Sequence, residues 1–197
     1  IITLKGHTET ICADLTEDYT DVTGYYSTHF PRISPPYVRE GIAHFMRKGK
    51  HYLLSSGTTG YLPNPSEIAV GDPAWTNQVL GDPHMEDPSH TSFHSQISCV
   101  LKVPGKKDLY IACADRWLPK RTYLNYLDYA DNFEAIFNPE SGKVPDWSVV
   151  ERKDKEHGIQ AGAENTDIAD YVWLPIIFEN DRPVIRWRDS WKLEEFE

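Results

Sequence analysis

The sequence lacks several features that would mark other protein classes. It contains 197 residues, and no apolar run approaches the ~18 residues that a membrane-spanning helix needs. Lys and Arg number 20 against 30 Asp and Glu, and this net charge of −10 argues against binding to nucleic acid or to an anionic membrane surface. Disorder is excluded because the 40% hydrophobic and 25% charged residues are close to the averages of globular proteins.

Cysteine is also scarce, with three residues in the chain. The number is odd and no C-x-x-C pair occurs, so we expect reduced, buried thiols. A single bridge between Cys99 and Cys113 stays open as an alternative, because both lie on neighbouring expected strands. The sequence shows no signal peptide and no N-glycosylation sequon. These features favour a reducing, cytoplasmic compartment over secretion.

Motifs of several enzyme classes are missing as well. There is no P-loop, no dinucleotide-binding G-x-G-x-x-G and no G-x-S-x-G nucleophile motif. His84, His90 and His94 stand in an acidic segment, but Pro83 and Pro88 argue against the helix that would align them as metal ligands. We expect a solvated loop there, with no metal site and no cofactor. A central Ca²⁺ ion has no support in the sequence.

Aromatic and turn-forming residues are abundant. Aromatic residues make up 12% of the chain, with 6 Trp and 11 Tyr, and 14 Pro stand beside 12 Gly. This composition indicates short strands joined by many loops. Tyr and Trp also offer flat apolar surfaces with a polar handle, which suit sugar rings.

Strand–turn–strand patterns dominate the chain. They recur at residues 43–55, 96–112 and 172–187, whereas helical periodicity is limited to 123–137. Small antiparallel sheets that repeat along a chain are typical of a β-propeller. A β-sandwich of about seven strands is the alternative, but the long irregular connections disfavour it.

One charged pair stands just before an apolar strand. Arg39 and Glu40 follow the extended Pro35-Pro36 entry, and Gly41 comes next. At the start of an inner propeller strand, a carboxyl group walled by aromatic rings could serve as a general acid. The alternative is a solvated glutamate at a strand end that pairs with Arg39.

Five segments, taken in order, resemble glycoside hydrolase family 43. Residues 38–45 resemble its acid-bearing blade, and 56–65 resemble the S-x-x-T-G-[WY]-x-P-N loop of the branch related to exo-β-1,3-galactanases. The other three blocks are His94-Ser95-Gln96, residues 114–117 and residues 171–176. The blocks span nearly the whole chain, so their order and spacing make the resemblance specific.

The resemblance implies an all-β fold, a five-bladed β-propeller with its active site in the central funnel. We expect about three to four blades in this chain, with one short helix. Residues 1–36 would end an early blade, 37–92 would form the acid-bearing blade, 93–158 the next blade and 159–197 the last. Since five blades need about 220 residues, we expect the chain to begin partway through the propeller.

The resemblance also implies hydrolysis of glycosides with inversion, a reaction that uses a general acid and an activated water. Glu40 matches the family's general acid. Gln96 matches a glutamine proposed to position or activate the water in the galactan-directed branch, which lacks the usual first-blade Asp. The family has a small residue and Pro after the acid, whereas this chain has Gly41-Ile42. Candidate substrate-binding residues are Arg39, Tyr61, Asn64, His94, Arg116, Trp117 and Glu164.

The sequence therefore predicts a glycosidase acting on plant-type oligosaccharides or polysaccharides, of the galactan or arabino/xylo type. The alternative is a truncated or non-catalytic propeller that binds sugars without the base-bearing blades. A structural β-domain whose aromatic residues form only a core is a third hypothesis. The sequence determines neither the sugar and linkage nor the oligomeric state.

Overall fold

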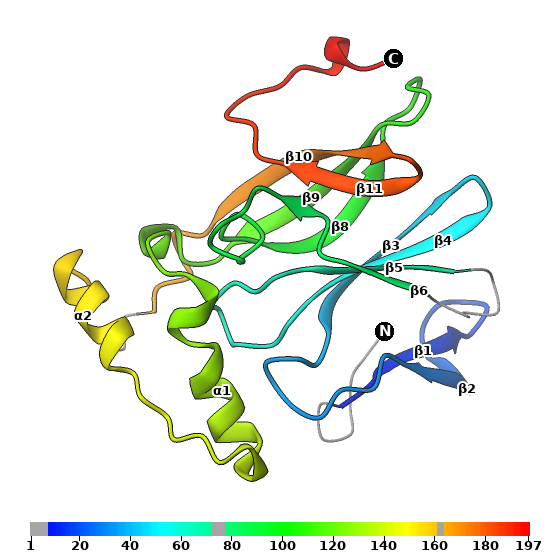
Figure 1. Cartoon of the computed structure of the whole chain (residues 1–197). Helices are drawn as coiled ribbons and strands as arrows, with labels where there is room; N and C mark the ends of the chain where they lie inside the picture. Colours follow the sequence, from blue (N-terminus) through cyan, green and yellow to red (C-terminus); the bar gives the residue numbers. More distant parts are fainter. Residues whose placement is uncertain (1–7, 72–77, 161–163) are drawn as a thin grey trace.

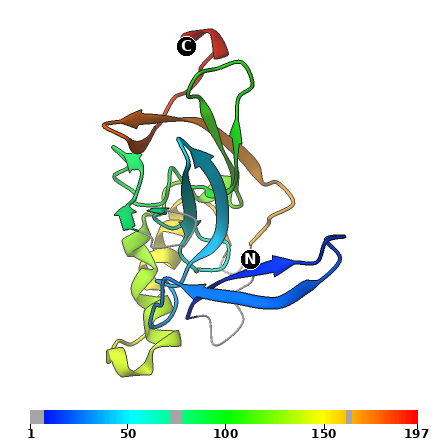
Figure 2. The same cartoon turned by 90° about the vertical axis from the view of Figure 1, so that its right-hand side faces the viewer.

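The computed structural model describes residues 8–71, 78–160 and 164–197, and it is mostly β-sheet. Its first sheet is an antiparallel hairpin of β1 (Thr10–Leu15) and β2 (Val22–His29). Figures 1 and 2 both place this hairpin at the opposite end of the molecule from the C-terminal strands. Nearly every residue of β2 is exposed.

The second sheet is a four-stranded antiparallel meander. Its strands, in order, are β3 (Glu40–Arg47), β4 (Lys50–Ser56), β5 (Glu67–Gly71) and β6 (Gln78–Gly81). Along β3 the side chains of Ala43, Phe45 and Arg47 are buried and those between them are more exposed. This alternation has the period of two that a half-buried strand requires.

The third sheet has five strands. Four of them form a second antiparallel meander, and the short β7 (His84–Met85) pairs in parallel with its last strand. The meander consists of β8 (Gln96–Lys102), β9 (Tyr110–Arg116), β10 (Asp170–Glu179) and β11 (Arg182–Arg186).

The two meanders pack face to face through one hydrophobic core, in which β3 lies against β8. Phe45 stacks on Tyr52 with ring centroids 4.9 Å apart. From the other sheet, Ile97, Tyr110 and Leu174 join this core. The packing therefore brings the starts of β3 and β8 together.

The sheet topology differs from the predicted blade boundaries in one respect. Residues 96–112 and 172–187 were assigned to separate blades, 93–158 and 159–197, but their strands share one sheet. The reason is the long pairing of β10 with β9, from Asp170 opposite Arg116 to Ile176 opposite Tyr110. The described residues thus hold two four-stranded meanders and a hairpin, and a closed five-bladed ring stays a prediction.

The helical prediction was partly wrong. A single helix was expected over 123–137, but the described residues form two, α1 (Ala130–Phe137) and α2 (Ser148–Glu156). Short 3₁₀ turns precede and follow them, namely η1 (Pro119–Arg121), η2 (Tyr126–Asp128), η3 (Pro139–Ser141) and η4 (Leu193–Glu195). Helices long and apolar enough to cross a membrane are absent from the described ranges.

Local packing explains both departures. Residues 123–129 have the apolar spacing of a helix but form turns. Leu124 and Tyr129 are buried there by packing with Leu62 in a second hydrophobic cluster. Helix α2 has no apolar stripe that a periodicity search could find. It is held by the buried Asp154, which accepts a hydrogen bond from Arg121 at 2.9 Å.

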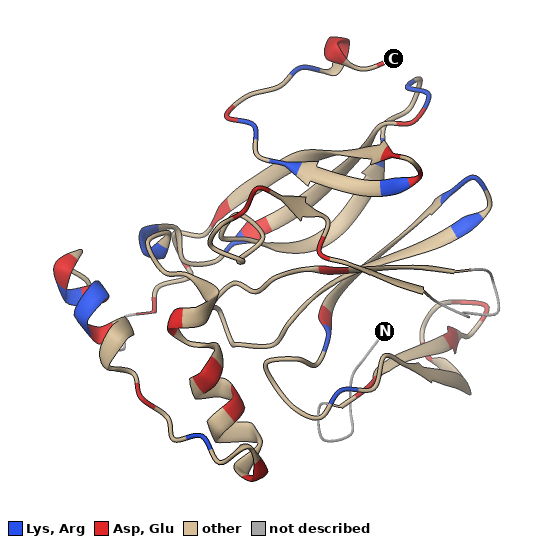
Figure 3. Ribbon diagram, in the orientation of Figure 1, with Lys and Arg blue, Asp and Glu red and all other residues tan. Residues whose placement is uncertain are grey.

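Lys and Arg residues stand near the hairpin tips farthest from the start of β3, and others lie on α2 and in loops (Figure 3). At these tips Arg47, with a side chain only 6% exposed, binds Asp108 through Nε at 2.8 Å. Its Nη1 binds Asp181 at 2.7 Å, and its guanidinium carbon lies 3.8 Å from the ring centre of Phe178. This cluster ties the turn of the first meander to both turns of the second.

The three thiols are free, but they are not uniformly buried as expected. Cys113 is buried, Cys12 is half-buried and Cys99 is exposed. Cys99 and Cys113 are direct partners across β8 and β9. Burial, together with the neighbouring Cys99, raises the pKa of Cys113 to about 12.

Candidate active site

The candidate site begins where β3 and β8 start side by side. Glu40 is the first residue of β3, Gln96 is the first residue of β8, and both side chains are half-buried. Gln96 Nε2 donates a hydrogen bond to Glu40 Oε1 at 3.0 Å. The acid and the amide named by the resemblance are thus in direct contact, although 56 positions separate them in the chain.

Gly41 makes this contact sterically feasible. Its φ angle is +56°, a left-handed conformation, and the pairing of β3 with β4 shifts register between Glu40 and Ala43. A Cβ at this position would lie 3.2 Å from Gln96 Nε2 and 3.1 Å from the carbonyl oxygen of Ile97. The glycine that departs from the family pattern therefore leaves room for the amide of Gln96.

The contact continues from Gln96 to an aromatic pair. Trp117 Nε1 donates a hydrogen bond to Gln96 Oε1 at 3.1 Å. The ring of Trp117 packs against Tyr61, with centroids 5.8 Å apart and planes at 55°. Tyr61 is 47% exposed, so one face of this pair is open to a ligand.

Beside this pair lies a narrow cleft whose wall combines aromatic, imidazole, carboxylate and guanidinium groups. The residues that line it are Tyr61, Pro63, His94, Ser95, Asp115, Trp117, Leu118 and Arg121. Of the predicted substrate-binding residues, Tyr61, His94 and Trp117 lie here. The cleft has a volume of about 10 Å³, which is room for about one water, so it does not enclose a sugar ring. A ring could stack on the exposed face of Tyr61 at its edge, where the polar groups of the wall can bind hydroxyls.

Asp115 is a member of this wall that was not among the predicted site residues. It is the direct cross-strand partner of Gln96 on β9. It also lies two positions before Trp117, and residues two apart on a strand face the same side. This spacing within the 114–117 motif was the signal that could have identified it.

His94 holds a defined orientation in the wall. Its Nδ1 lies 3.1 Å from Thr91 Oγ1, and its φ angle is +59°. Burial lowers the pKa of His94, and the charge of Arg116 lowers it further while Asp87 opposes them. The imidazole is therefore neutral at pH 7, and it can form a hydrogen bond with a hydroxyl group without carrying a positive charge.

Two predicted substrate contacts are instead bound to groups of the protein itself. Arg39 is buried, and its Nε and Nη2 donate to Ser55 Oγ at 3.0 Å and Ser55 O at 2.7 Å. Asn64 is 2% exposed, and its amide donates to Leu62 O at 3.2 Å and to Thr59. Both side chains hold loops next to the site and do not line the cleft.

The remaining two lie at its margin. Arg116 points to the other side of β9 from Trp117, donates to Phe93 O at 2.9 Å and lies 5.5 Å from the ring centre of Trp187. Glu164 is exposed, and its Oε1 lies 3.7 Å from Arg121 Nη1. Arg121 belongs to the cleft wall, so Glu164 reaches the cleft only through that residue.

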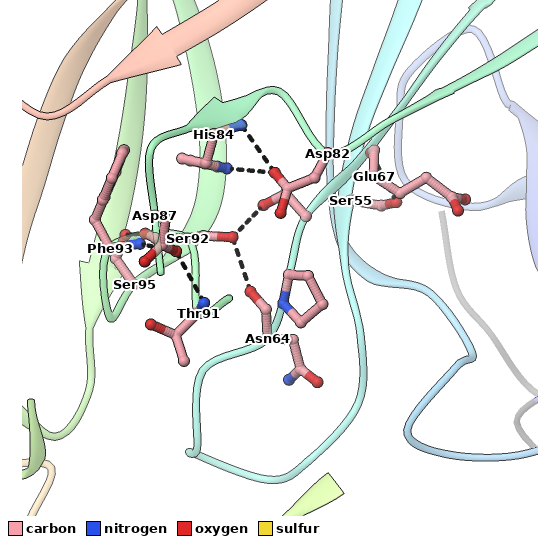
Figure 4. A network of polar contacts seen from close by, with 12 residues as sticks. Ser55, Asn64, Glu67, Asp82, His84, Asp87, Thr91, Ser92, Phe93 and Ser95 are labelled. Atoms are coloured by element: carbon pink, nitrogen blue, oxygen red, sulfur yellow. Dashed lines mark hydrogen bonds and ion pairs between the residues drawn. The ribbon is translucent and has the colours of Figure 1, made fainter. Parts of the chain in front are cut away.

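The acidic segment with three histidines is a hydrogen-bonded loop, which Figure 4 shows from close by. The carboxylate of Asp87 accepts bonds from the backbone N–H groups of Ser89, Thr91 and Phe93 at 3.1, 2.9 and 3.0 Å. Burial acts to raise the pKa of Asp87, but these bonds outweigh it and lower the pKa. Within the described part of the chain, no cluster of side chains suits a metal ion.

Comparisons with known proteins gave matches among solved structures. No family model matches the sequence, and a search of curated proteins also found no match. A GH43 β-1,3-galactosidase superposes with a TM-score of 0.68 at 22% identity, covering 98% of this chain and 31% of that chain. An exo-β-1,3-galactanase from Clostridium thermocellum gives 0.56 at 21% identity, covering 91% of this chain and 29% of that one.

A third structure contains a ligand. It is an exo-β-1,3-galactanase from Phanerochaete chrysosporium with β-1,3-galactotriose, and it gives a TM-score of 0.58 at 16% identity, covering 92% of this chain and 30% of that one. The chain therefore has the fold of part of a family 43 glycoside hydrolase. Among such enzymes, the structures it matches are β-1,3-galactosidases and exo-β-1,3-galactanases, and the chain spans about a third of their length.

Proposed function

We propose that the protein is a glycosidase that hydrolyses O-glycosidic bonds in galactose-containing glycans with inversion, using Glu40 as the general acid. The observation that carries the proposal is the 3.0 Å contact between Glu40 and Gln96 beside the aromatic cleft. The family resemblance predicts Glu40 as the acid and Gln96 as the amide, and their contact supports a shared role for the two side chains. The two meanders are then blades of a propeller whose funnel contains this cleft.

The chemistry that this pair supports is protonation of the leaving oxygen. Glu40 gives its proton to the glycosidic oxygen as the bond from the anomeric carbon to that oxygen breaks. A water attacks the opposite face of the same carbon and forms the new bond, which inverts the configuration. The proton that this water loses passes to solvent, and solvent returns Glu40 to its acid form.

Gln96 contributes position and not basicity. A neutral amide is a very weak base, but its N–H and carbonyl groups can orient a water or a neighbouring carboxyl group. Trp117 and Tyr61 offer the apolar surface on which a galactose ring can stack. Galactose is the preferred sugar because the solved structures with this fold are named for β-1,3-galactosides.

Hydrolysis of β-1,3-galactotriose by the full chain tests the proposal. Wild type, Glu40→Gln and Glu179→Gln are compared by galactose release, since Glu179 is an exposed carboxylate paired with Arg186 away from the cleft. We expect Glu40→Gln to lower the rate by about 100-fold or more and Glu179→Gln to leave it unchanged. Equal rates for wild type and Glu40→Gln would remove Glu40 from the mechanism.

Calorimetry with the same trisaccharide tests the alternative, a propeller that binds sugars without hydrolysing them. Binding without any release of galactose by the wild-type chain would show that the protein is a sugar-binding module and not an enzyme. Absence of both binding and release would contradict every carbohydrate function proposed here.

A further inference from the structure

We propose that Trp117 is a positioning residue whose indole N–H sets the orientation of the Gln96 amide, so that an amide N–H and not the amide oxygen faces the carboxyl group of Glu40. The inference rests on the proposed function, because it concerns the amide that faces the same general acid. It assigns Trp117 a role through Gln96 that differs from stacking against sugar.

The orientation of the amide follows from what each partner can donate. An indole nitrogen carries a hydrogen and has no acceptor capacity, so the atom that faces it at 3.1 Å must be the amide oxygen. The amide nitrogen then faces Glu40 Oε1 at 3.0 Å. A flipped amide would set two N–H groups against each other at the indole, so Trp117 excludes that arrangement.

The orientation has a consequence for the protonated acid. A protonated carboxyl group donates one hydrogen bond, and its oxygens can still accept. The amide N–H that faces Oε1 cannot accept the proton of Glu40, so this proton is not bound by Gln96. With a flipped amide, the carbonyl of Gln96 would accept the proton of Glu40 and hold it on Oε1, directed at the amide and away from a leaving group.

Proton transfer then leaves the contact intact. The O–H bond of Glu40 breaks, the hydrogen binds the glycosidic oxygen and the bond from that oxygen to the anomeric carbon breaks. The carboxylate that remains still accepts the amide N–H at Oε1, a charge-assisted bond that is stronger than the one to the neutral acid. The amide therefore favours the charge that develops on Glu40 during the reaction.

The surroundings hold both side chains in this arrangement. Trp117 packs against Tyr61, and the carbonyl oxygen of Ile97 with the amide of Gln96 occupies the space that a Cβ on residue 41 would need. The amide consequently has a fixed rotamer between the indole and the carboxyl group. Because this rotamer is fixed, the indole N–H of Trp117 can determine which end of the Gln96 amide faces Glu40.

Side-chain NMR of the ¹⁵N-labelled full chain tests the inference without needing turnover. We expect the indole proton of Trp117 to shift with pH as Glu40 titrates, because the amide transmits the change. Other ionisable side chains line the same cleft, so Glu40→Gln is included to identify the Glu40 step. Gln96→Leu should abolish that step. The indole of Trp191, which donates to the carbonyl oxygen of Trp173 at 2.9 Å, should not show it.

The variant Trp117→Phe tests the positioning role itself. We expect the low-field amide proton of Gln96 that faces Glu40 to be lost as a distinct signal, whereas Trp191→Phe retains it with the same backbone spectrum. Unchanged amide protons in Trp117→Phe, or a Trp117 indole proton that ignores Glu40 in the wild type, would overturn the inference. If either of these results is found while the wild-type chain hydrolyses galactotriose, only the positioning role of Trp117 is wrong. If the resonances behave as expected but the wild-type chain does not hydrolyse galactotriose, only the proposed function is wrong.

Discussion

Strand β3 carries a charged side chain at each end, and the two ends have different partners. Arg47 at one end is surrounded by the carboxylates of Asp108 and Asp181. Glu40 at the other end contacts the neutral amide of Gln96. An ion pair holds both partners in their charged forms. The Arg47 end is therefore suited to stability, whereas the Glu40 end carries the proposed general acid.

The largest expected effect comes from removing the acid at the Glu40 end. On β-1,3-galactotriose, Glu40→Gln should lower the rate by about 10²–10⁴-fold, because the leaving oxygen needs a proton. On 4-nitrophenyl β-galactoside, whose leaving group departs as an anion, the loss should be less than about 10-fold. Similar losses on both substrates would show that Glu40 does not act by protonation.

The next largest effect is on stability, at the other end of the strand. Arg47→Met should lower the free energy of unfolding by about 2 kcal/mol, a moderate value because both aspartates are partly exposed. Arg186→Met, which breaks a solvent-exposed pair with Glu179, should leave it almost unchanged. Urea unfolding measures both changes in stability, and equal changes would contradict the distinction between the Arg47 cluster and an exposed ion pair.

Two glycines sharpen the comparison, one near each end of β3. Gly41 and Gly49 have φ angles of +56° and +75°, so an alanine at either should cost about 1 kcal/mol. A Cβ at Gly41 would crowd Gln96, whereas nothing lies within 4 Å of one at Gly49. We expect only Gly41→Ala to slow hydrolysis, by about tenfold as one hydrogen bond is displaced. Thermal unfolding and the galactotriose assay check the pair, and slowing by Gly49→Ala would contradict the account.

The smallest expected effect is the pH dependence of the Arg47 cluster. Hydrogen bonds from Arg47 and Lys48 lower the pKa of Asp181 to about 2, below its ordinary value near 3.9. A lowered carboxyl pKa in the folded state stabilises the protein above about pH 4, and this contribution is lost as the pH falls towards 2. The difference in urea midpoint between wild type and Arg47→Met should therefore shrink from pH 6 to pH 2.5. A difference that grows would contradict this assignment.

The motifs predicted Glu40 and Gln96 as catalytic residues and Tyr61, His94 and Trp117 as substrate contacts, but they did not predict that Glu40 and Gln96 touch. Short segments that begin or end strands keep their order and spacing in a repeated-sheet fold, which is why the motifs could place these residues near one another. Arg39 was predicted as a substrate contact, but it precedes β3 and its buried side chain binds Ser55 of β4.

Other parts of the fold depend on contacts that no local pattern records. Helix α2 is held by the buried pair of Arg121 and Asp154, which lie in different elements. The pairing of β10 with β9 across a long connection merged two predicted blades into one sheet. The loop motif predicted Asn64 as a substrate contact, but its buried amide binds Thr59 and Leu62 instead.

The most direct test of the central claim is the configuration of the first sugar released from β-1,3-galactotriose, followed by ¹H NMR before mutarotation. The account predicts that the wild-type chain first releases α-galactose, because Glu40 protonates the leaving oxygen while water attacks the opposite face. It also predicts that Glu40→Gln releases almost none in the same time. Initial release of β-galactose, or release that Glu40→Gln leaves unchanged, would contradict it.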